Sequence, residues 1–206
     1  MIKNSGGGDF VVIRSSGADG YNPYVYSELG GVDSIETLII DSEEKANCPE
    51  TFEKIKNAEA LFIAGGDQSK YYSYWKNSKV EEALNYLVNE KRITIGGTSA
   101  GLAILGEIVY TAENASVDSK EVLKNPLTDR ITLKNDFLNI PLLKDIITDT
   151  HFNQRNRQGR LIAYTREVKS GLSTEDKLKA IGVDENTAVL LDSNGIGKIF
   201  AHNAYF

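Results

Sequence analysis

One serine stands in a segment with almost no side-chain bulk. Residues 92–105 read RITIGGTSAGLAIL, where a β-branched stretch typical of a strand meets two glycines and then an apolar run typical of a helix. Gly97-Thr98-Ser99-Ala100-Gly101 fits the pattern G-x-S-x-G, which presents a serine on a sharp turn between a strand and a helix. The chemistry that this spacing indicates is nucleophilic attack by the Ser99 hydroxyl.

The physical reason lies in the backbone of such a turn. It forces the serine into a strained conformation, and the flanking glycines prevent clashes with neighbouring backbone. The hydroxyl then stands clear of the sheet, and the free N–H groups at the start of the helix can stabilise an oxyanion. A Gly-rich turn in which Ser99 merely caps the helix fits the same residues. The segment alone leaves both interpretations open.

A serine nucleophile needs a general base, and the chain has two histidines. His202 lies near the end, in KIFAHNAYF, where we expect a partly exposed strand residue. His151 follows ITDT at the carboxyl end of an apolar segment, from where it could reach a serine at another strand end. We therefore predict His151 as the base, and this favours the nucleophile at Ser99.

Three arginines follow His151 in the stretch HFNQRNRQGR: Arg155, Arg157 and Arg160. The chain is acidic overall, with a net charge of −6, and yet arginine rather than lysine is used each time. Arginine binds carboxylates in a bidentate geometry, so we expect a pocket for an acidic substrate. A solvated basic helix face is the alternative.

These groups can act together only if the strand ends that carry them lie close together. The first half of the chain alternates strand-like and helix-like segments, a pattern that predicts a parallel sheet. We predict strands within 10–17, 34–41, 60–68 and 92–95 and helices within 23–29, 48–58, 78–91 and 100–108. Short apolar strands separated by helices predict an α/β fold with a mostly parallel sheet and helices on both faces. Gly65–Gln68 and Gly96–Gly101 are Gly-rich loops at strand ends, where such sheets carry their sites.

The second half is less regular. The polar stretch 111–126 predicts loop, and 153–168 predicts a loop followed by a helix. Residues 187–192 and 197–202 predict two strands joined by a hairpin turn at Ser193-Asn194-Gly195.

Composition limits the function classes. At 206 residues we expect one domain, 1–206, and the acidic balance argues against nucleic-acid binding. No apolar run is long enough for a membrane span. A single cysteine, Cys48, excludes an intrachain disulfide framework and a Cys-rich metal site. The first residues show no signal peptide, so we expect a cytoplasmic protein, or a secreted one if a signal was removed.

Three stretches together carry a family resemblance. FIAGGDQ, GGTSAGLA and DTHFNQRNRQGRL, in this order and at these intervals, resemble the S51 serine peptidases, which include cyanophycinases and aspartyl dipeptidases. The last motif is long and specific, and the match is closer to the cyanophycinase-like proteins. The resemblance implies a three-layer, class I glutamine-amidotransferase-like (flavodoxin-like) sheet with a nucleophile elbow, a homodimer, and no metal or organic cofactor.

The resemblance also implies roles for single residues. Ser99 is the nucleophile and His151 the base, and the amides of Ala100 and Gly66 form the oxyanion hole. The substrate-binding positions that it implies are Gln68, Asp149, Thr150, Arg155, Arg157 and Arg160. In cyanophycinases the substrate is a polymer with an aspartate backbone and arginine on each β-carboxyl. Asp149 would hold an arginine side chain or an α-amino group, and the arginines would hold carboxylates.

Two departures from the family pattern matter. Thr150 stands where cyanophycinases typically have a glutamine that helps to define the substrate pocket, so the polymer itself is in question as substrate. The family places the triad acid after the elbow helix, and we predict Glu113, with Asp118 and then Glu121 as alternatives. The resemblance leaves open whether the chain lacks terminal strands of the family fold.

We therefore expect a serine peptidase that cleaves aspartyl or β-aspartyl peptide bonds. One alternative keeps the chemistry and acts as a dipeptidase on N-terminal aspartate. Another is a non-catalytic binding protein on the same fold. A cysteine-dependent amidotransferase is disfavoured, because the turn holds Ser99 and Cys48 lies elsewhere.

Overall fold

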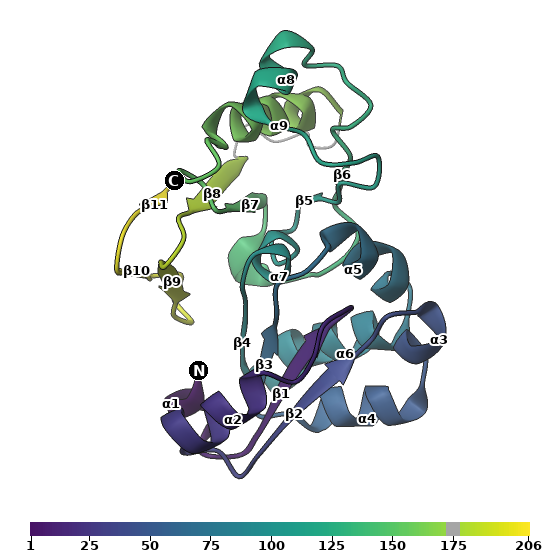
Figure 1. Ribbon diagram of the computed structural model, residues 1–206, viewed down its shortest axis with the longest axis vertical. Helices are drawn as coiled ribbons and strands as arrows, with labels where there is room; N and C mark the ends of the chain where they lie inside the picture. Colours follow the sequence, from purple (N-terminus) through teal and green to yellow (C-terminus); the bar gives the residue numbers. More distant parts are fainter. Residues whose placement is uncertain (172–177) are drawn as a thin grey trace. The chain divides into compact units, whose positions relative to one another are not determined.

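The computed structural model describes residues 1–171 and 178–206, and its contacts divide the chain into two compact units, Met1–Gly101 and Leu102–Phe206 (Figure 1). The predicted single domain over 1–206 stays a prediction. The elements of the first unit, with one helix that crosses into the second, are α1 (Ile2–Ser5), β1 (Asp9–Arg14), α2 (Tyr21–Pro23), the π-helical η1 (Tyr24–Leu29), β2 (Ser34–Ile39), α3 (Glu43–Ala46), α4 (Pro49–Asn57), β3 (Ala60–Ile63), α5 (Gln68–Trp75), α6 (Lys79–Tyr86), the π-helical η2 (Leu87–Lys91), β4 (Thr94–Gly97) and α7 (Ala100–Ala103).

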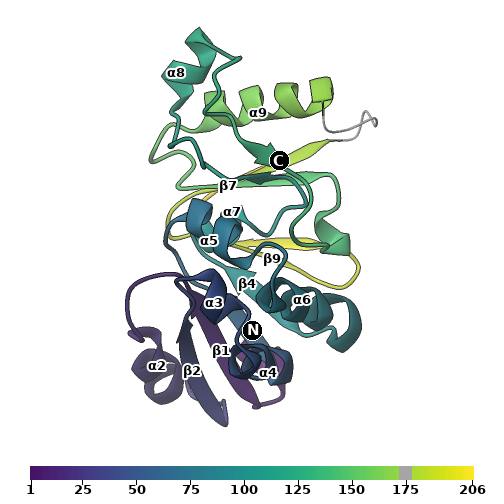
Figure 2. The same ribbon diagram turned by 90° about the vertical axis from the view of Figure 1, so that its right-hand side faces the viewer.

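The first unit is built on a four-stranded parallel sheet in the order β2-β1-β3-β4. Alternate residues of β1 face opposite sides of the sheet, as the two-residue period of a strand requires. Phe10 and Val12 pack with Val25 of η1 on one side, and Val11 and Ile13 are buried on the other. In Figure 2 strands β1 and β2 lie between α2 and α4, so helices cover both faces of the sheet.

Local signals set the helix boundaries of this unit. Pro49 stands at the first turn of α4, where its missing N–H costs nothing. The Ser78 hydroxyl accepts from the Val80 amide and caps α6. Arg92 ends η2 in the left-handed region, at φ 57°, and the chain enters β4 two residues later.

The second unit has fewer residues in helices and strands among those that the structure describes. Its elements are β5 (Val109–Tyr110), α8 (Ser119–Lys124), β6 (Leu133–Lys134), the 3₁₀ turn η3 (Pro141–Leu143), β7 (Ile146–Thr150), α9 (Gln158–Gly171), β8 (Lys179–Val183), β9 (Ala188–Leu191), β10 (Gly197–Phe200) and β11 (Ala204–Tyr205). Strands β7 and β8 pair in parallel, and β11 adds to β8 in the opposite direction. Leu161 and Tyr164 of α9 pack with Ile147 of β7 in one apolar cluster, and Figure 2 shows α9 beside these strands.

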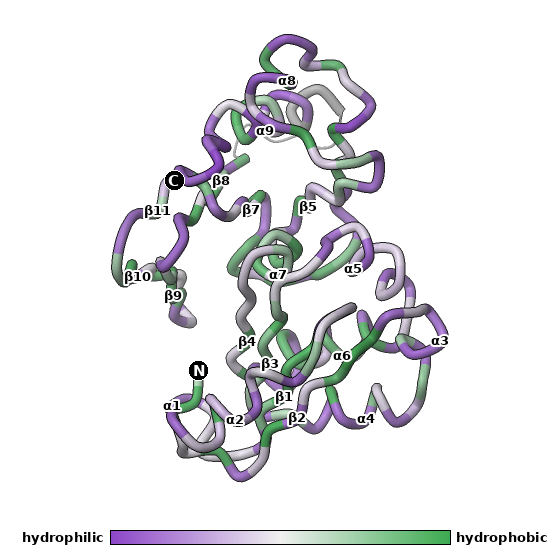
Figure 3. Tube along the Cα trace, in the orientation of Figure 1, coloured by the Kyte–Doolittle hydropathy of each residue, from purple (hydrophilic) through white to green (hydrophobic). Residues whose placement is uncertain are grey.

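The α/β class and the mostly parallel sheet with helices on both faces are confirmed. The hairpin is confirmed as well: β9 and β10 pair antiparallel around Gly195, which has φ 78°. In Figure 3 the later part of β2 is hydrophobic while α3 is hydrophilic.

Two expectations differ from the structure. The helix expected over 100–108 is a single turn, Ala100–Ala103; the chain beyond it packs closely at Gly106, where a Cβ would lie 2.6 Å from the Ile146 carbonyl oxygen. The loop expected over 111–126 contains α8, which the Asp118 carboxylate caps by accepting from the Glu121 amide. Within the described residues, no helix has both the length and the apolar character that crossing a membrane requires.

Candidate active site

Ser99 lies on the turn between β4 and α7, as the sequence predicts. Its φ is 51°, in the left-handed region that non-glycine residues rarely adopt. The turn is fixed by two backbone bonds: the Thr98 amide donates to the Ile63 carbonyl at 3.0 Å, and the Gly101 amide donates to the Thr98 carbonyl at 2.9 Å. Such a strained conformation persists only where the surrounding structure enforces it, and strained residues of this kind cluster at functional sites.

Glycine is required two residues after Ser99. A Cβ on Gly101 would lie 2.1 Å from the Ile63 carbonyl oxygen and 2.8 Å from the Ala64 carbonyl oxygen. No side chain fits at those distances, so Gly101 allows the first turn of α7 to sit directly on the end of β3.

The loop after β3 lies against Ser99 within the first unit. A Cβ on Gly65 would be 3.2 Å from the Ser99 Cβ and 3.8 Å from its Oγ. The Tyr71 hydroxyl supports this loop by donating to the Ala64 and Gly65 carbonyls, at 2.9 and 3.0 Å. Burial raises the pKa of Tyr71 to about 12, so the hydroxyl keeps its proton for these bonds at neutral pH.

The predicted residues of the first unit are therefore brought together. Gly66 is the exposed second glycine of the loop, and Gln68 is the first residue of α5, half-buried, directly after the Asp67 cap. Ala100 is the buried first residue of α7. The two strand ends thus place Ser99, the two amides predicted for the oxyanion hole and Gln68 at one edge of the sheet.

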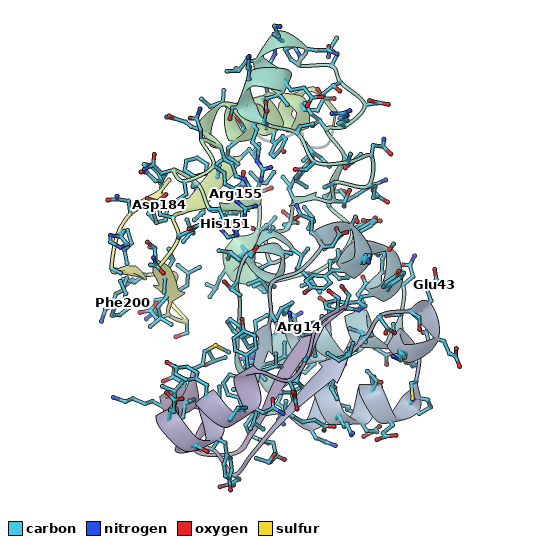
Figure 4. All side chains as sticks on the ribbon, in the orientation of Figure 1. Arg14, Glu43, His151, Arg155, Asp184 and Phe200 are labelled. Carbon is cyan, nitrogen blue, oxygen red and sulfur yellow. The ribbon has the colours of Figure 1, made fainter. Side chains whose placement is uncertain are left out.

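His151 lies in the second unit, directly after β7, and it too has a positive φ, 47°. Its Nδ1 is 2.7 Å from the Glu185 Oε1. The pairing of β7 with β8 explains this contact: Thr150 is opposite Val183, so the residues that follow the two strands meet. Figure 4 shows His151, Arg155 and Asp184 gathered there.

Two more bonds fix the loops around His151. The Asn153 amide donates to the Asp184 carboxylate at 2.8 Å, and the Glu185 amide donates to the Gln154 side-chain oxygen at 2.9 Å. These bonds tie the loop after His151 to Asp184 and Glu185, the residues that follow β8. An acid held in this way can orient an imidazole and fix its tautomer.

The structure gives the acids of the sequence analysis other contacts. The Glu113 carboxylate accepts from the Thr111 hydroxyl at 2.8 Å, Asp118 caps α8, and Glu121 pairs with Arg130 at 2.9 Å. The acid at Nδ1 of His151 is Glu185, which the sequence analysis did not single out. The sequence does show Glu185 directly after Gly182-Val183-Asp184, at the end of an apolar segment. It does not show that this segment pairs with β7, and the contact with His151 depends on that pairing.

Asp149 and Arg160 form a buried ion pair. Their exposed fractions are 3% and 2%, and Arg160 donates from Nε to Oδ2 at 2.7 Å and from Nη2 to Oδ1 at 2.5 Å. The guanidinium also lies over the rings of Tyr110 and Tyr164, 5.4 and 5.8 Å from their centroids. Burial acts to lower the pKa of Arg160, but hydrogen bonding to Asp149 and its charge outweigh this and raise it.

This burial changes the interpretation of the pair. A side chain that is almost fully enclosed and bound at both ends of its fork does not present its charge to a substrate. In this structure Arg160 and Asp149 hold α9 against β7, whereas the sequence predicted substrate contacts for both.

Arg157 and Arg155 are more accessible. Arg157 donates from Nη1 to the Thr150 carbonyl at 2.8 Å and to the Thr150 hydroxyl and Asp149 at 3.3 Å each. Burial, with the neighbouring Arg160 charge, lowers the pKa of Arg157 to about 10, which leaves it cationic at neutral pH. Thr150 is 5% exposed, and Arg155 is exposed on the loop that follows His151.

The described part of the chain contains no group of three or more His, Cys, Asp or Glu side chains that could hold a metal ion. That no metal or organic cofactor takes part stays a prediction.

Comparison with known proteins gives consistent matches. The chain is 28% identical over 174 residues to a cyanophycinase of Synechococcus elongatus, which covers 84% of this chain and 49% of that protein. A cyanophycinase of Trichormus variabilis is 28% identical over 171 residues, covering 83% of this chain and 51% of that protein. The chain thus spans about half the length of these curated relatives.

Two solved structures share the fold. A peptidase from an acI-B1 actinobacterium has a TM-score of 0.57 at 18% identity, with 91% of this chain and 73% of that chain covered. A putative peptidase E protein from Listeria monocytogenes has a TM-score of 0.53 at 15% identity, with 97% and 89% covered. At these identities the likeness concerns the fold, which is that of the class I glutamine-amidotransferase type.

The family model described as Peptidase family S51 matches residues 18–199, a range that includes Ser99, His151 and Glu185. A match of this extent takes in both units and nearly the whole chain. The chain belongs to peptidase family S51.

Proposed function

We propose that the protein is a serine peptidase that cleaves aspartyl or β-aspartyl peptide bonds by a Ser-His-acid mechanism. The observation that carries the proposal is the left-handed Ser99 at the β4–α7 turn, with the Gly65–Gly66 loop packed against it. This geometry supports a nucleophile elbow at Ser99. Membership of a peptidase family supports the same reaction class.

In the proposed reaction the Ser99 Oγ attacks the peptide carbonyl and its proton passes to Nε2 of His151. The contact with Glu185 implies that Nδ1 carries a proton and donates it to the carboxylate, so Nε2 is the basic nitrogen. His151 then protonates the leaving amine, and the C–N bond breaks to give an acyl-enzyme. Water adds to this ester with His151 again as base, releasing the acid and regenerating Ser99.

The amides of Ala100 and Gly66 are proposed as the oxyanion hole. Ala100 follows Ser99 at the start of α7, and Gly66 belongs to the loop that touches Ser99. Two backbone N–H groups aimed at the developing charge stabilise it without reorganising during the reaction. Gln68, in the same loop, is proposed to contact the substrate.

The arginines beside His151 support an acidic substrate. Arg157 and Arg155 are cationic groups next to the proposed base, and guanidinium groups suit carboxylates. Asp149, in contrast, is bound by Arg160, Arg157 and the Thr150 amide. It has little remaining capacity to hold the arginine side chain of a cyanophycin-like polymer. This observation favours the second candidate, a dipeptidase for N-terminal aspartate.

Turnover assays would separate these candidates. Hydrolysis by the wild-type protein is measured with Asp-X dipeptides and with the β-Asp-Arg polymer under the same conditions. We expect hydrolysis of the acidic peptides, abolished in Ser99→Ala and retained in Ser73→Ala, whose hydroxyl lies on α5 and donates to the Lys70 carbonyl. Unchanged hydrolysis in Ser99→Ala would contradict the proposal, and no hydrolysis at all would favour a binding protein.

A homodimer is part of the proposal and rests on the family resemblance alone. Light scattering on the purified chain is expected to give twice the mass of 22.7 kDa; a mass of one chain at micromolar concentration would contradict it.

A further inference from the structure

The carboxyl ends of β1 and β3 form a part of the first unit that the proposed mechanism does not use. The chain runs from β1 to β2 on one side and then to β3 on the other, so the strand order reverses between β1 and β3. In open parallel sheets ligands bind in the crevice at such a reversal, outside the carboxyl ends of the strands. The loops there are residues 15–20 after β1 and 64–67 after β3.

Arg14, the last residue of β1, places its guanidinium on the first of these loops. Its Nη1 donates to the Ala18 carbonyl at 3.1 Å. A Cβ on Gly17, which has φ 96°, would lie 2.5 Å from Nη2, so glycine at 17 makes the room that the guanidinium occupies. Over residues 1–171 and 178–206, the buried Nε of Arg14 has no hydrogen-bond partner.

Ser15, the next residue, also has a buried polar atom without a hydrogen-bond partner among the described residues. The atom is Oγ, and the exposed fraction of the residue is 2%. Buried donors without partners are rare because they lose their water without compensation. Arg14 and Ser15 are consecutive residues at the end of β1, and each has a buried donor that a ligand group accepting hydrogen bonds could satisfy.

Arg14 brings a positive charge to this place, beside the Asp67 carboxylate on the second loop. Burial raises the pKa of Tyr71, and the Arg14 charge is close enough to act in the opposite direction. The Tyr71 hydroxyl in turn contacts the Gly65 carbonyl, in the loop that touches Ser99. Tyr71 thus has Arg14 nearby and also contacts the loop that touches Ser99.

The strand register sets the separation. Ile13 pairs with Ile63 and Ile63 with Gly97, so Arg14 and Thr98 stand level on strands two apart. At ~4.8 Å between neighbouring strands this is about 10 Å. A peptide extends ~3.4 Å per residue, so a substrate with its scissile carbonyl at Ser99 would reach Arg14 with a group two or three residues away.

We propose that Arg14 and Ser15 form a carboxylate-binding subsite for the peptide substrate of Ser99. Arg14 binds the carboxylate through its planar fork, and the Ser15 hydroxyl donates a further bond. The carboxylate belongs to an acidic side chain or to the C-terminus of the peptide. This inference rests on the proposed function and extends it, since it adds an anchor for acidic substrates within the first unit.

The test compares peptides that differ only in this charge. Four versions of one Asp-containing tetrapeptide combine Asp or Asn at the third position with a free or an amidated C-terminus. In Arg14→Gln, kcat/KM for the version whose carboxylate is bound should fall about 10–100-fold, because hydrogen bonds to charged groups are lost. The matched neutral version should change less than about 3-fold. If Arg14→Gln loses the preference for Asp over Asn, the bound carboxylate is the side chain. If it loses the preference for the free over the amidated C-terminus, the bound carboxylate is the terminal one.

Two further variants and one control make the result specific. Gly17→Ala pushes the guanidinium from its place without removing the charge, and it should weaken the same preference. Arg14→Lys keeps the charge without the fork and should lie in between. Arg92→Gln, an exposed arginine that precedes β4 at the opposite end of the sheet, should keep the full preference. Equal losses on charged and neutral peptides, or an unchanged preference in Arg14→Gln, would overturn the subsite.

Binding separates this inference from the proposed function. Calorimetry in a Ser99→Ala background measures affinity for the same peptides without turnover. Weaker binding of the charged peptide after adding Arg14→Gln supports the subsite even if the wild-type protein hydrolyses nothing, in which case only the proposed function fails. Ser99-dependent turnover combined with binding that ignores Arg14→Gln overturns the subsite and leaves the proposed function standing.

Discussion

At the scale of single residues, the two groups assigned to proton transfer share an unusual backbone. Ser99 and His151 each follow a strand, and each has a positive φ although neither is glycine. Such residues cost of order 1–3 kcal/mol and persist where the surrounding structure enforces them. In both cases the side chain stands after the end of a strand rather than on a face of the sheet.

Glu185 gives the sharpest prediction at this scale. Changing it to glutamine keeps the volume and removes the carboxylate that is proposed to orient His151, so kcat should fall by about 100-fold or more with little change in KM. Glu113→Gln serves as the matched control, because Glu113 bonds Thr111, and it should retain activity. Steady-state kinetics that showed the reverse pattern would return the role to Glu113.

Tyr71 gives a prediction for alkaline pH. The pKa of a tyrosine in an unfolded chain is about 10, and that of Tyr71 in the folded chain is about 12. Between these values the folded state holds a proton that the unfolded state has lost. The stabilisation is complete below about pH 10 and disappears as pH rises through about 12, a loss of ~2–3 kcal/mol. In urea titrations at about pH 9 and 12, the stability difference between wild type and Tyr71→Phe should shrink by that amount. A constant difference would contradict the assignment.

At the scale of elements, the short helix α7 depends on contact with the end of β3. Gly101→Ala puts a methyl group 2.1 Å from the Ile63 carbonyl oxygen, so α7 must shift and carry Ser99 and the Ala100 amide with it. We expect a loss of ~1–3 kcal/mol in stability and a fall in kcat. Gly20→Ala is the control, since nothing lies within 4 Å of its Cβ. Equal behaviour of the two variants in unfolding and activity assays would refute this role.

The elements also show how far the sequence could predict the fold. Strands β1 to β4 are short and apolar and alternate with capped helices, so they were predictable. The length of α7 was not, because the chain that follows it packs at Gly106 against Ile146, forty residues later in the chain. The pairing of β7 with β8 could not be predicted either, since α9 separates the two strands in the sequence.

At the scale of the whole molecule, the residues proposed for the reaction are divided between the two units. Ser99, Gly66 and Ala100 belong to the first, and His151 and Glu185 to the second. The motifs predicted the nucleophile and the base because each sits in a local pattern. They did not predict the contact of Glu185 with His151, because it depends on strand pairing. They also did not predict the burial of Arg160, because a cationic stretch has the same letters whether it faces solvent or Asp149.

The central claim is that Ser99 is a nucleophile activated by His151, and an active-site label tests it most directly. Folded protein is treated with a fluorophosphonate probe, and the modified residue is mapped by mass spectrometry in the wild type and in His151→Ala. The account predicts labelling at Ser99 in the wild type and labelling at least about 100-fold slower in His151→Ala. Absence of label at Ser99, or equal rates in the two proteins, would contradict it.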